Sequence, residues 1–200
     1  MKKTFFLTII FVLGFFAMNA QIPVTINFNS TNTGRSINVL ASKLLDGRHE
    51  LGGGLCFNIN KQTANDDQSN VYRKRLYAGN PWEFFGVEGF YQVHFLKNLP
   101  HVDLFAFYDI QYRFAHTRFS THPTSGVYST FGPFHWIEQN VGLGFSVDIW
   151  KNLFLIQRLG GGVSFIVGKD KPHNPDGILK TQQTVTMLDY LYTVGLGYRF

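Results

Sequence analysis

The sequence is poor in charged residues, has almost no cysteine and contains no long apolar run beyond its first residues. Charged residues make up 16% of the 200 positions, whereas soluble domains carry about 25%. The single cysteine, Cys56, excludes a disulfide within the chain. A mean hydropathy of −0.05 is too low for a bundle of apolar helices, each of which needs about 20 apolar residues to cross a membrane.

Aromatic residues and glycine are abundant instead. The chain has 21 Phe, 9 Tyr and 20 Gly, and a disordered chain has few aromatic residues. In a transmembrane β-barrel, lipid-facing and lumen-facing residues alternate, so that their hydropathies cancel in the mean. The composition therefore predicts an all-β transmembrane barrel in one domain. The net charge of +5 falls to +3 without Lys2 and Lys3, a mild excess that gives no reason to expect nucleic acid as a partner.

The first twenty residues have the pattern of a secretory signal peptide. Lys2 and Lys3 form a basic start, residues 5–16 are apolar, and Ala20 suits cleavage before Gln21. The alternative is an uncleaved anchor, although the apolar segment is shorter than a membrane span. We expect residues 1–20 to be removed and residues 21–200 to form the barrel.

Apolar and polar residues alternate along most of the mature chain, which is the period of a β-strand. The pattern is clearest beyond residue 183, where one face is apolar and aromatic and the other is polar or small. The predicted strands are 22–29, 36–45, 49–60, 83–96, 102–118, 134–150, 153–168 and the C-terminal segment from 183. Eight is an even number, as single-chain bacterial barrels require. The 102–118 strand exceeds the span that a membrane needs, so we expect it to project from the membrane.

The predicted connections alternate between short and long. The short ones are 46–48, 97–101 and 151–152, and the long ones are 30–35, 61–81, 120–133 and 169–182. Outer-membrane barrels have short periplasmic turns and longer extracellular loops. The N-terminus is therefore expected on the periplasmic side.

The signal peptide, the eight alternating strands and the terminal Tyr198-Arg199-Phe200 resemble the small outer-membrane β-barrel family of the OmpA, OmpX and OmpW type. The resemblance implies a monomer in the bacterial outer membrane, inserted by the barrel assembly machinery. It also implies that this machinery reads Tyr198 and Phe200. Members of the family include structural, adhesive, transporting and lipid-modifying proteins, so the activity stays open.

Charged residues fall on the lumen side of the predicted strands. An eight-stranded barrel is just wide enough for side chains to fill it, and buried charges must be paired. We expect a lumen charge network of Glu50, Glu88, His94, Asp103, Asp109, Arg113, Glu138, Asp148, Arg158, Asp189 and Arg199. Arg158 is expected to contact Glu138, Asp148 or Asp189. The alternative reading is a path for protons or small solutes, gated by rearranging pairs.

The predicted outer loops offer further candidates. Arg73, Lys74, Arg75 and Arg118 suit contacts to lipopolysaccharide phosphates, or else form solvated loops. Asp66 and Asp67 are a weak signal for a divalent ion. We expect no metal site and no cofactor, because no histidines stand at metal-ligand spacing.

An esterase acting on lipid A would need a serine and a histidine at the outer rim. The candidates there are His116, Ser120, His122, Ser125 and His135. No His-x-Ser element stands at a strand edge, and we therefore expect no catalytic residues. The function expected from the sequence is structural or surface-interacting, through the extracellular loops. Transport of small apolar solutes and the esterase are the alternatives.

Overall fold

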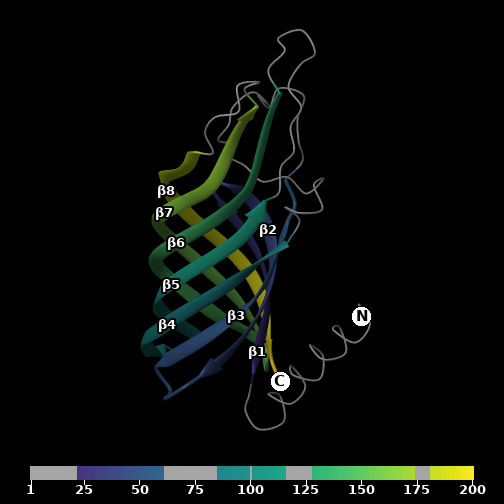
Figure 1. Cartoon of the computed structure of the whole chain (residues 1–200). Helices are drawn as coiled ribbons and strands as arrows, with labels where there is room; N and C mark the ends of the chain where they lie inside the picture. The colour runs from purple at the N-terminus through teal and green to yellow at the C-terminus, as the bar shows by residue number, and fades with distance from the viewer. Residues whose placement is uncertain (1–21, 61–84, 100, 116–127, 174–180) are drawn as a thin grey trace.

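The structure, a computed structural model, describes residues 22–60, 85–99, 101–115, 128–173 and 181–200. These residues form eight antiparallel strands that pair in chain order and close into a barrel, which confirms the predicted fold (Figure 1). The strands are β1 (Pro23–Thr31), β2 (Gly34–Leu44), β3 (His49–Asn58), β4 (Phe85–Leu99), β5 (Val102–Ala115), β6 (Tyr128–Trp150), β7 (Leu153–His173) and β8 (Thr181–Arg199).

The alternation in the sequence places apolar side chains outside the barrel and polar ones inside. On β1, Ile26 and Phe28 are exposed on the outer face, whereas Asn27 and Asn29 are fully buried. Residues 188–193 of β8 repeat the alternation of exposed and buried side chains, with the apolar Leu191 among the buried ones. Because β1 also pairs with β8, the hydrogen-bond ladder closes without a free edge along β1.

The connection between β1 and β2 is much shorter than predicted. Thr31 pairs with Gly34, so Asn32 and Thr33 alone form the turn, and the expected long connection at 30–35 is wrong. Gly34 has a φ of 134°, which suits glycine. Thr31, which was expected in this loop, is instead a buried residue at the end of β1, whereas Arg35 is an exposed residue of β2.

The longest strands are also placed differently from the prediction. β6 has 23 residues and β7 has 21, whereas β5 has 14 and its described part ends at Ala115. Parts of the predicted connections 120–133 and 169–182 therefore belong to strands. β8 pairs with β1 only as far as Leu191. Further along, β6 and β7 continue to pair with each other and rise beyond the shorter strands in Figure 1.

The Asn32-Thr33 turn lies at one end of the barrel, and the three other short connections lie at the opposite end, here called the short-turn end. They are residues 45–48, 100–101 and 151–152. At the first of them, Asp46 Oδ1 accepts hydrogen bonds from the backbone N–H groups of His49 (2.8 Å) and Arg48 (3.1 Å). These bonds hold the pKa of Asp46 below its usual value. Pro23 pairs with Arg199, so the barrel also begins and ends at the short-turn end.

Glycines on the inner face make room for large side chains. A Cβ at Gly52 would overlap the Phe90 ring, and one at Gly144 would overlap Phe105. Within the described residues, buried polar or charged side chains outnumber buried apolar ones by 22 to 10. The interior is thus mainly polar, with a small cluster of apolar side chains around Phe105.

No helix in the described part of the chain is long and apolar enough to cross a membrane.

Candidate functional site in the barrel interior

The barrel interior holds the charged residues that the alternation placed on the lumen side. Seven of them are buried, namely Glu88, His94, Asp109, Arg113, Glu138, Arg158 and Asp189. Four lie nearer the short-turn end and are partly exposed, namely Glu50, Asp103, Asp148 and Arg199. Buried charges are tolerated only when they are paired or hydrogen-bonded, so their contacts decide what this interior can do.

Arg158 on β7 is almost completely buried in the interior. Its Nη1 is 3.5 Å from Glu88 Oε1 and 3.9 Å from Asp109 Oδ2. Its guanidinium also lies over the Phe90 ring, 4.3 Å from the centroid. The amide of Gln92, turned to present its oxygen, accepts hydrogen bonds from Arg158 Nε at 3.0 Å and Nη2 at 2.8 Å.

The predicted partners of Arg158 are therefore wrong. Asp148 pairs with Phe154, nearer the short-turn end, and Asp189 pairs with Gly162, further along β7. Directly beside Arg158 on β6 stands Gly144, which has no side chain. The guanidinium therefore reaches across the lumen to β4 and β5.

Neutral side chains also contact Glu88. Its Oε2 accepts hydrogen bonds from Asn29 Nδ2 at 3.3 Å and from Asn38 Nδ2. Cys56 Sγ lies 3.9 Å from the same oxygen. Three donors from β1, β2 and β3 thus meet one carboxylate of β4.

A second group of contacts continues toward the other end of the barrel. Gln111 donates to Asp109 Oδ1 at 3.1 Å and accepts from Arg113 Nη2 at 2.8 Å. Arg113 Nη1 donates to Thr33 Oγ1 at 3.3 Å and lies 3.9 Å from Glu138 Oε1. Gln111 therefore links the contacts of Arg158 with Glu88 and Asp109, here called the Arg158 cluster, to those of Arg113 with Thr33 and Glu138, here called the Arg113 cluster.

Asp189 is held without an arginine. Its Oδ1 accepts from the backbone N–H groups of Tyr190 (2.9 Å) and Asn32 (3.0 Å). Its Oδ2 accepts from Asn140 Nδ2 at 3.2 Å. Three such bonds satisfy a carboxylate inside a protein.

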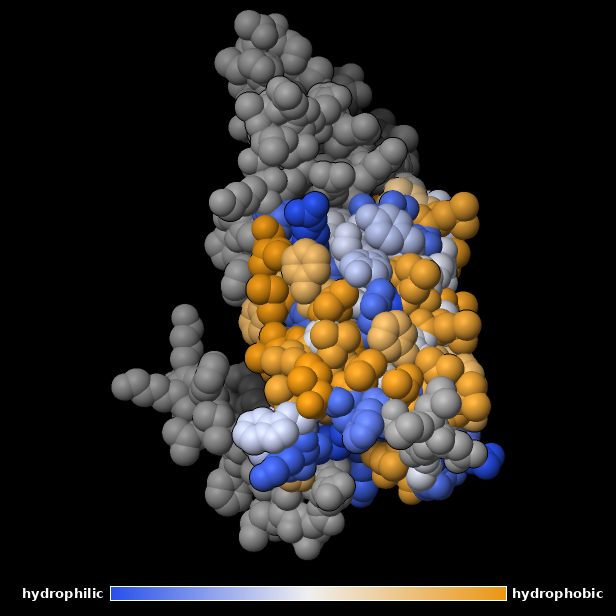
Figure 2. All heavy atoms as spheres, turned by 180° about the vertical axis from the view of Figure 1, so that it is seen from behind, coloured by the Kyte–Doolittle hydropathy of each residue, from blue (hydrophilic) through white to orange (hydrophobic). Residues whose placement is uncertain are grey.

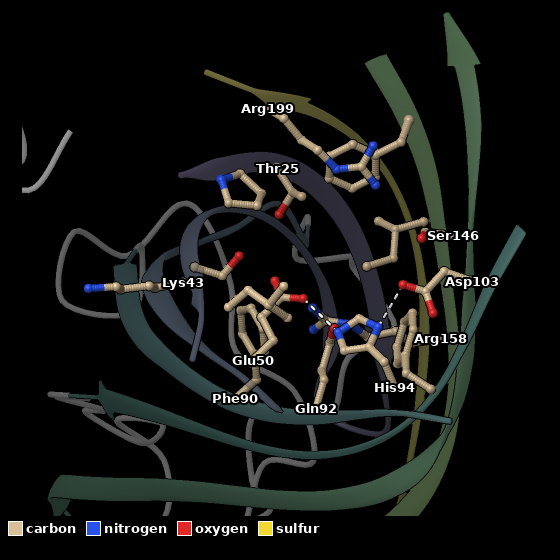
Figure 3. A pocket seen from close by; sticks show the side chains of 16 residues that line it. Thr25, Lys43, Glu50, Phe90, Gln92, His94, Asp103, Ser146, Arg158 and Arg199 are labelled. Carbon is tan, nitrogen blue, oxygen red and sulfur yellow. Dashed lines mark hydrogen bonds and ion pairs between the residues drawn. The ribbon is translucent and has the colours of Figure 1, made fainter. Parts of the chain in front are cut away.

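A cavity of about 380 Å³ lies in the interior next to the short-turn end. Its wall carries His94, whose Nε2 lies 2.8 Å from Glu50 Oε2 and whose Nδ1 lies 2.8 Å from Asp103 Oδ2 (Figure 3). Glu50 Oε2 is hydrogen-bonded to Nε2, whereas Asp103 Oδ2 lies close to Nδ1 without the geometry of a hydrogen bond. When the ring is protonated, it is one imidazolium between two carboxylates, contributed by β3, β4 and β5.

Arg199 also lines this cavity. Its Nη1 lies 2.6 Å from Asp148 Oδ1, and its guanidinium lies 4.4 Å from the centre of the Phe154 ring. Arg199 and Asp148 thus form a pair of their own.

The amides in this interior were not part of the expected charge network. Asn29, Asn38, Gln92, Gln111 and Asn140 all donate to or accept from its charged members. The sequence does indicate these amides, because they occupy the same inward-facing alternate positions of the strands as the charged residues.

Most of the candidates in the predicted loops lie outside the described residues. They are Asp66, Asp67, Arg73, Lys74, Arg75, His116, Arg118, Ser120, His122 and Ser125. Of the esterase candidates, His135 is described, and its Nδ1 lies 2.8 Å from Tyr112 Oη on the outer face. In the described part of the chain, no three His, Cys, Asp or Glu side chains are grouped so as to hold a metal ion.

The two residues expected to carry the assembly signal lie on the outer face at the end of the barrel. The rings of Tyr198 and Phe200 meet edge to face, with 4.9 Å between their centroids. Both side chains are exposed.

No protein-family model matches this chain, and neither does any curated protein sequence.

Proposed function

We propose that this chain is an integral outer-membrane β-barrel with a side-chain-filled lumen, which acts structurally or through its extracellular loops. The observation that carries the proposal is the distribution of side chains in the barrel, which is the inverse of that in a soluble protein. Apolar residues cover the middle of the outer wall in Figure 2, whereas the buried residues are mainly polar. A barrel in water would have the opposite arrangement.

Large apolar side chains are exposed on several strands. Leu143, Leu159 and Leu188 have exposed fractions of 62%, 65% and 81%. Soluble monomers rarely expose apolar patches larger than a few hundred Å². Removing such a side chain from water stabilises by about 1.5–3 kcal/mol, so a lipid surround is the favourable one.

The proposal places the short-turn end in the periplasm and the segments 61–84, 116–127 and 174–180 outside the cell. Short periplasmic turns and longer outer loops are typical of such barrels. Arg73, Lys74, Arg75 and Arg118 would then meet lipopolysaccharide phosphates by paired hydrogen bonds. Insertion by the barrel assembly machinery through Tyr198 and Phe200, and a monomeric state, belong to the same proposal.

Transport of a small solute is the second candidate, and the cavity is the observation that favours it. The cavity is lined by charged groups of both signs, including Glu50, Asp103 and Arg199. Such a lining suits polar solutes rather than the small apolar solutes of the transport alternative given in the sequence analysis. Beyond it, Arg113 and Glu138 are buried in side-chain contacts, which favours a structural role for the lumen.

The proposal is tested by membrane flotation and by gel migration. We expect the mature protein to float with outer membranes and to migrate faster unheated than boiled, because a closed ladder survives detergent until it is heated. Recovery of folded protein from the soluble periplasmic fraction would refute the proposal.

A further inference from the structure

We propose that the cavity at the short-turn end binds small organic cations bearing an ammonium group. In this site Asp103 and Glu50 provide the negative charge, and His94 is the internal cation with which the ligand competes. The inference concerns the cavity alone and goes beyond the proposed structural role.

The cavity has the dimensions of a ligand site. Its volume of about 380 Å³ lies within the range of small-molecule pockets, about 300–1,000 Å³. Aromatic and aliphatic side chains form part of the lining, including Phe90, Phe105 and Ile156. Figure 3 shows Glu50, His94 and Asp103 side by side on one wall of this space.

The charges of this wall do not balance. Glu50 and Asp103 share a single ring, that of His94, at 2.8 Å on each side. Two carboxylates against one imidazolium leave an excess negative charge. An added cation would remove this excess, whereas an added anion would increase it.

The other positive groups of the lining already have acidic partners. Arg199 pairs with Asp148 at 2.6 Å, and Arg158 lies 3.5 Å from Glu88 and 3.9 Å from Asp109. Lys43 is exposed, and in Figure 3 its ammonium points away from the cavity. The two arginines thus have carboxylate partners other than Glu50 and Asp103.

Three polar atoms of the lining lack a hydrogen-bond partner. Among the described residues, Asp103 Oδ1, Thr25 Oγ1 and His94 Nδ1 are buried and have no such partner. A buried acceptor without a donor costs about 1–3 kcal/mol. An ammonium has three donors and no acceptor, which matches a carboxylate oxygen better than an alcohol or an anion does.

The aromatic lining already accommodates cations. A guanidinium lies 4.3 Å from the centre of the Phe90 ring, and another lies 4.4 Å from that of Phe154. Ring faces attract cations, most strongly where water is excluded. Phe105 adds a third ring, 5.5 Å from that of His94.

The test uses the whole mature protein in detergent micelles and two probes of similar length and opposite charge. The probes are 1,4-diaminobutane and succinate, titrated while the amide NMR signals of the protein are followed. We expect 1,4-diaminobutane to bind and succinate not to bind. Asp103→Asn should weaken the binding about ten- to a hundredfold, the value of one charge-assisted hydrogen bond.

His94→Gln should act in the opposite direction. It removes the competing cation and keeps a hydrogen-bonding side chain, so binding of 1,4-diaminobutane should strengthen by about fivefold or more. Asp46→Asn makes the same chemical change at a turn outside the cavity and should leave the affinity unchanged. If Asp103→Asn does not fold, Asp103→Glu takes its place as the test. It retains the charge and should retain binding of 1,4-diaminobutane.

Opposite effects of Asp103→Asn and His94→Gln on the affinity for 1,4-diaminobutane support the site, because a general loss of folding would weaken binding in both variants. Absence of 1,4-diaminobutane binding at millimolar concentration would overturn the inference. Succinate binding that strengthens in Asp103→Asn would also overturn it and assign the cavity to anions. Neither result bears on membrane insertion, which flotation tests separately.

Discussion

At the scale of single residues, this interior depends on matching a few charges with neutral amides. Glu88 is bonded to two asparagines as well as to Arg158. Hydrogen bonds to charged groups are about twice as strong as those between neutral groups. The amides thus allow buried carboxylates to exceed buried arginines in number.

Arg158→Leu tests this arrangement. The substitution leaves the carboxylates of Glu88 and Asp109 without their cation, and breaking a buried pair costs about 3–5 kcal/mol. We expect the free energy of unfolding, measured by urea titration in lipid vesicles, to fall by that amount.

Arg48→Leu provides the matched control, because Arg48 is exposed in a turn. Surface substitutions usually change stability by less than about 0.5 kcal/mol. Equal stabilities of the two variants would contradict the assigned role of Arg158.

At the scale of one strand, the two faces of β6 meet different surroundings. Leu143 is exposed on the outer face, whereas the neighbouring Gly142 faces inward against β7. A Cβ at Gly142 would lie 2.6 Å from the Cα of Gly160, which backbone atoms cannot accommodate. The outer position has space for a side chain and the inner one has none.

Leu143→Arg therefore probes the proposed lipid contact. An arginine at the bilayer midplane costs about 2–4 kcal/mol in a barrel of this kind. We expect that loss in the free energy of unfolding measured in vesicles. Leu143→Phe should fold with nearly parental stability, since it stays apolar.

An unchanged stability of Leu143→Arg would mean that this position does not face lipid. Gly142→Ala distinguishes the two faces, because its cost is steric and should persist in detergent. A shift of register by one residue would exchange the behaviour of the two positions.

At the scale of the whole molecule, closure of the ladder and the packing beyond the cavity belong together. Because β1 pairs with β8, polar side chains of different strands face one enclosed lumen, where many of them contact one another. The Arg158 cluster and the Arg113 cluster are linked through Gln111 and cross much of the lumen. Such an interior is expected to obstruct ion flow.

Recordings in planar bilayers test this expectation. The parent protein should give no steady single-channel currents, and Arg158→Leu should also be silent, because leucine fills much of the volume that arginine leaves. Steady currents in the parent would favour the transport alternative over the structural one.

The sequence by itself determined the fold class, the number of strands and the face on which most side chains lie. Period-two alternation is a property of neighbouring residues, so it can be read without knowing which strands meet. Ile26 and Asn27 differ in environment for this local reason. The ends of strands were less well determined, because an inward-facing polar residue and a loop residue look alike, as at Thr31.

Only the tertiary structure decided which side chains meet across the lumen. Arg158 contacts β4 and β5 rather than its neighbours, and His94 lies between acids of β3 and β5. These pairings depend on strand tilt, on register and on where glycines leave space. None of these is a local property, so the cavity and the contacts of the charges around it follow from the closed barrel alone.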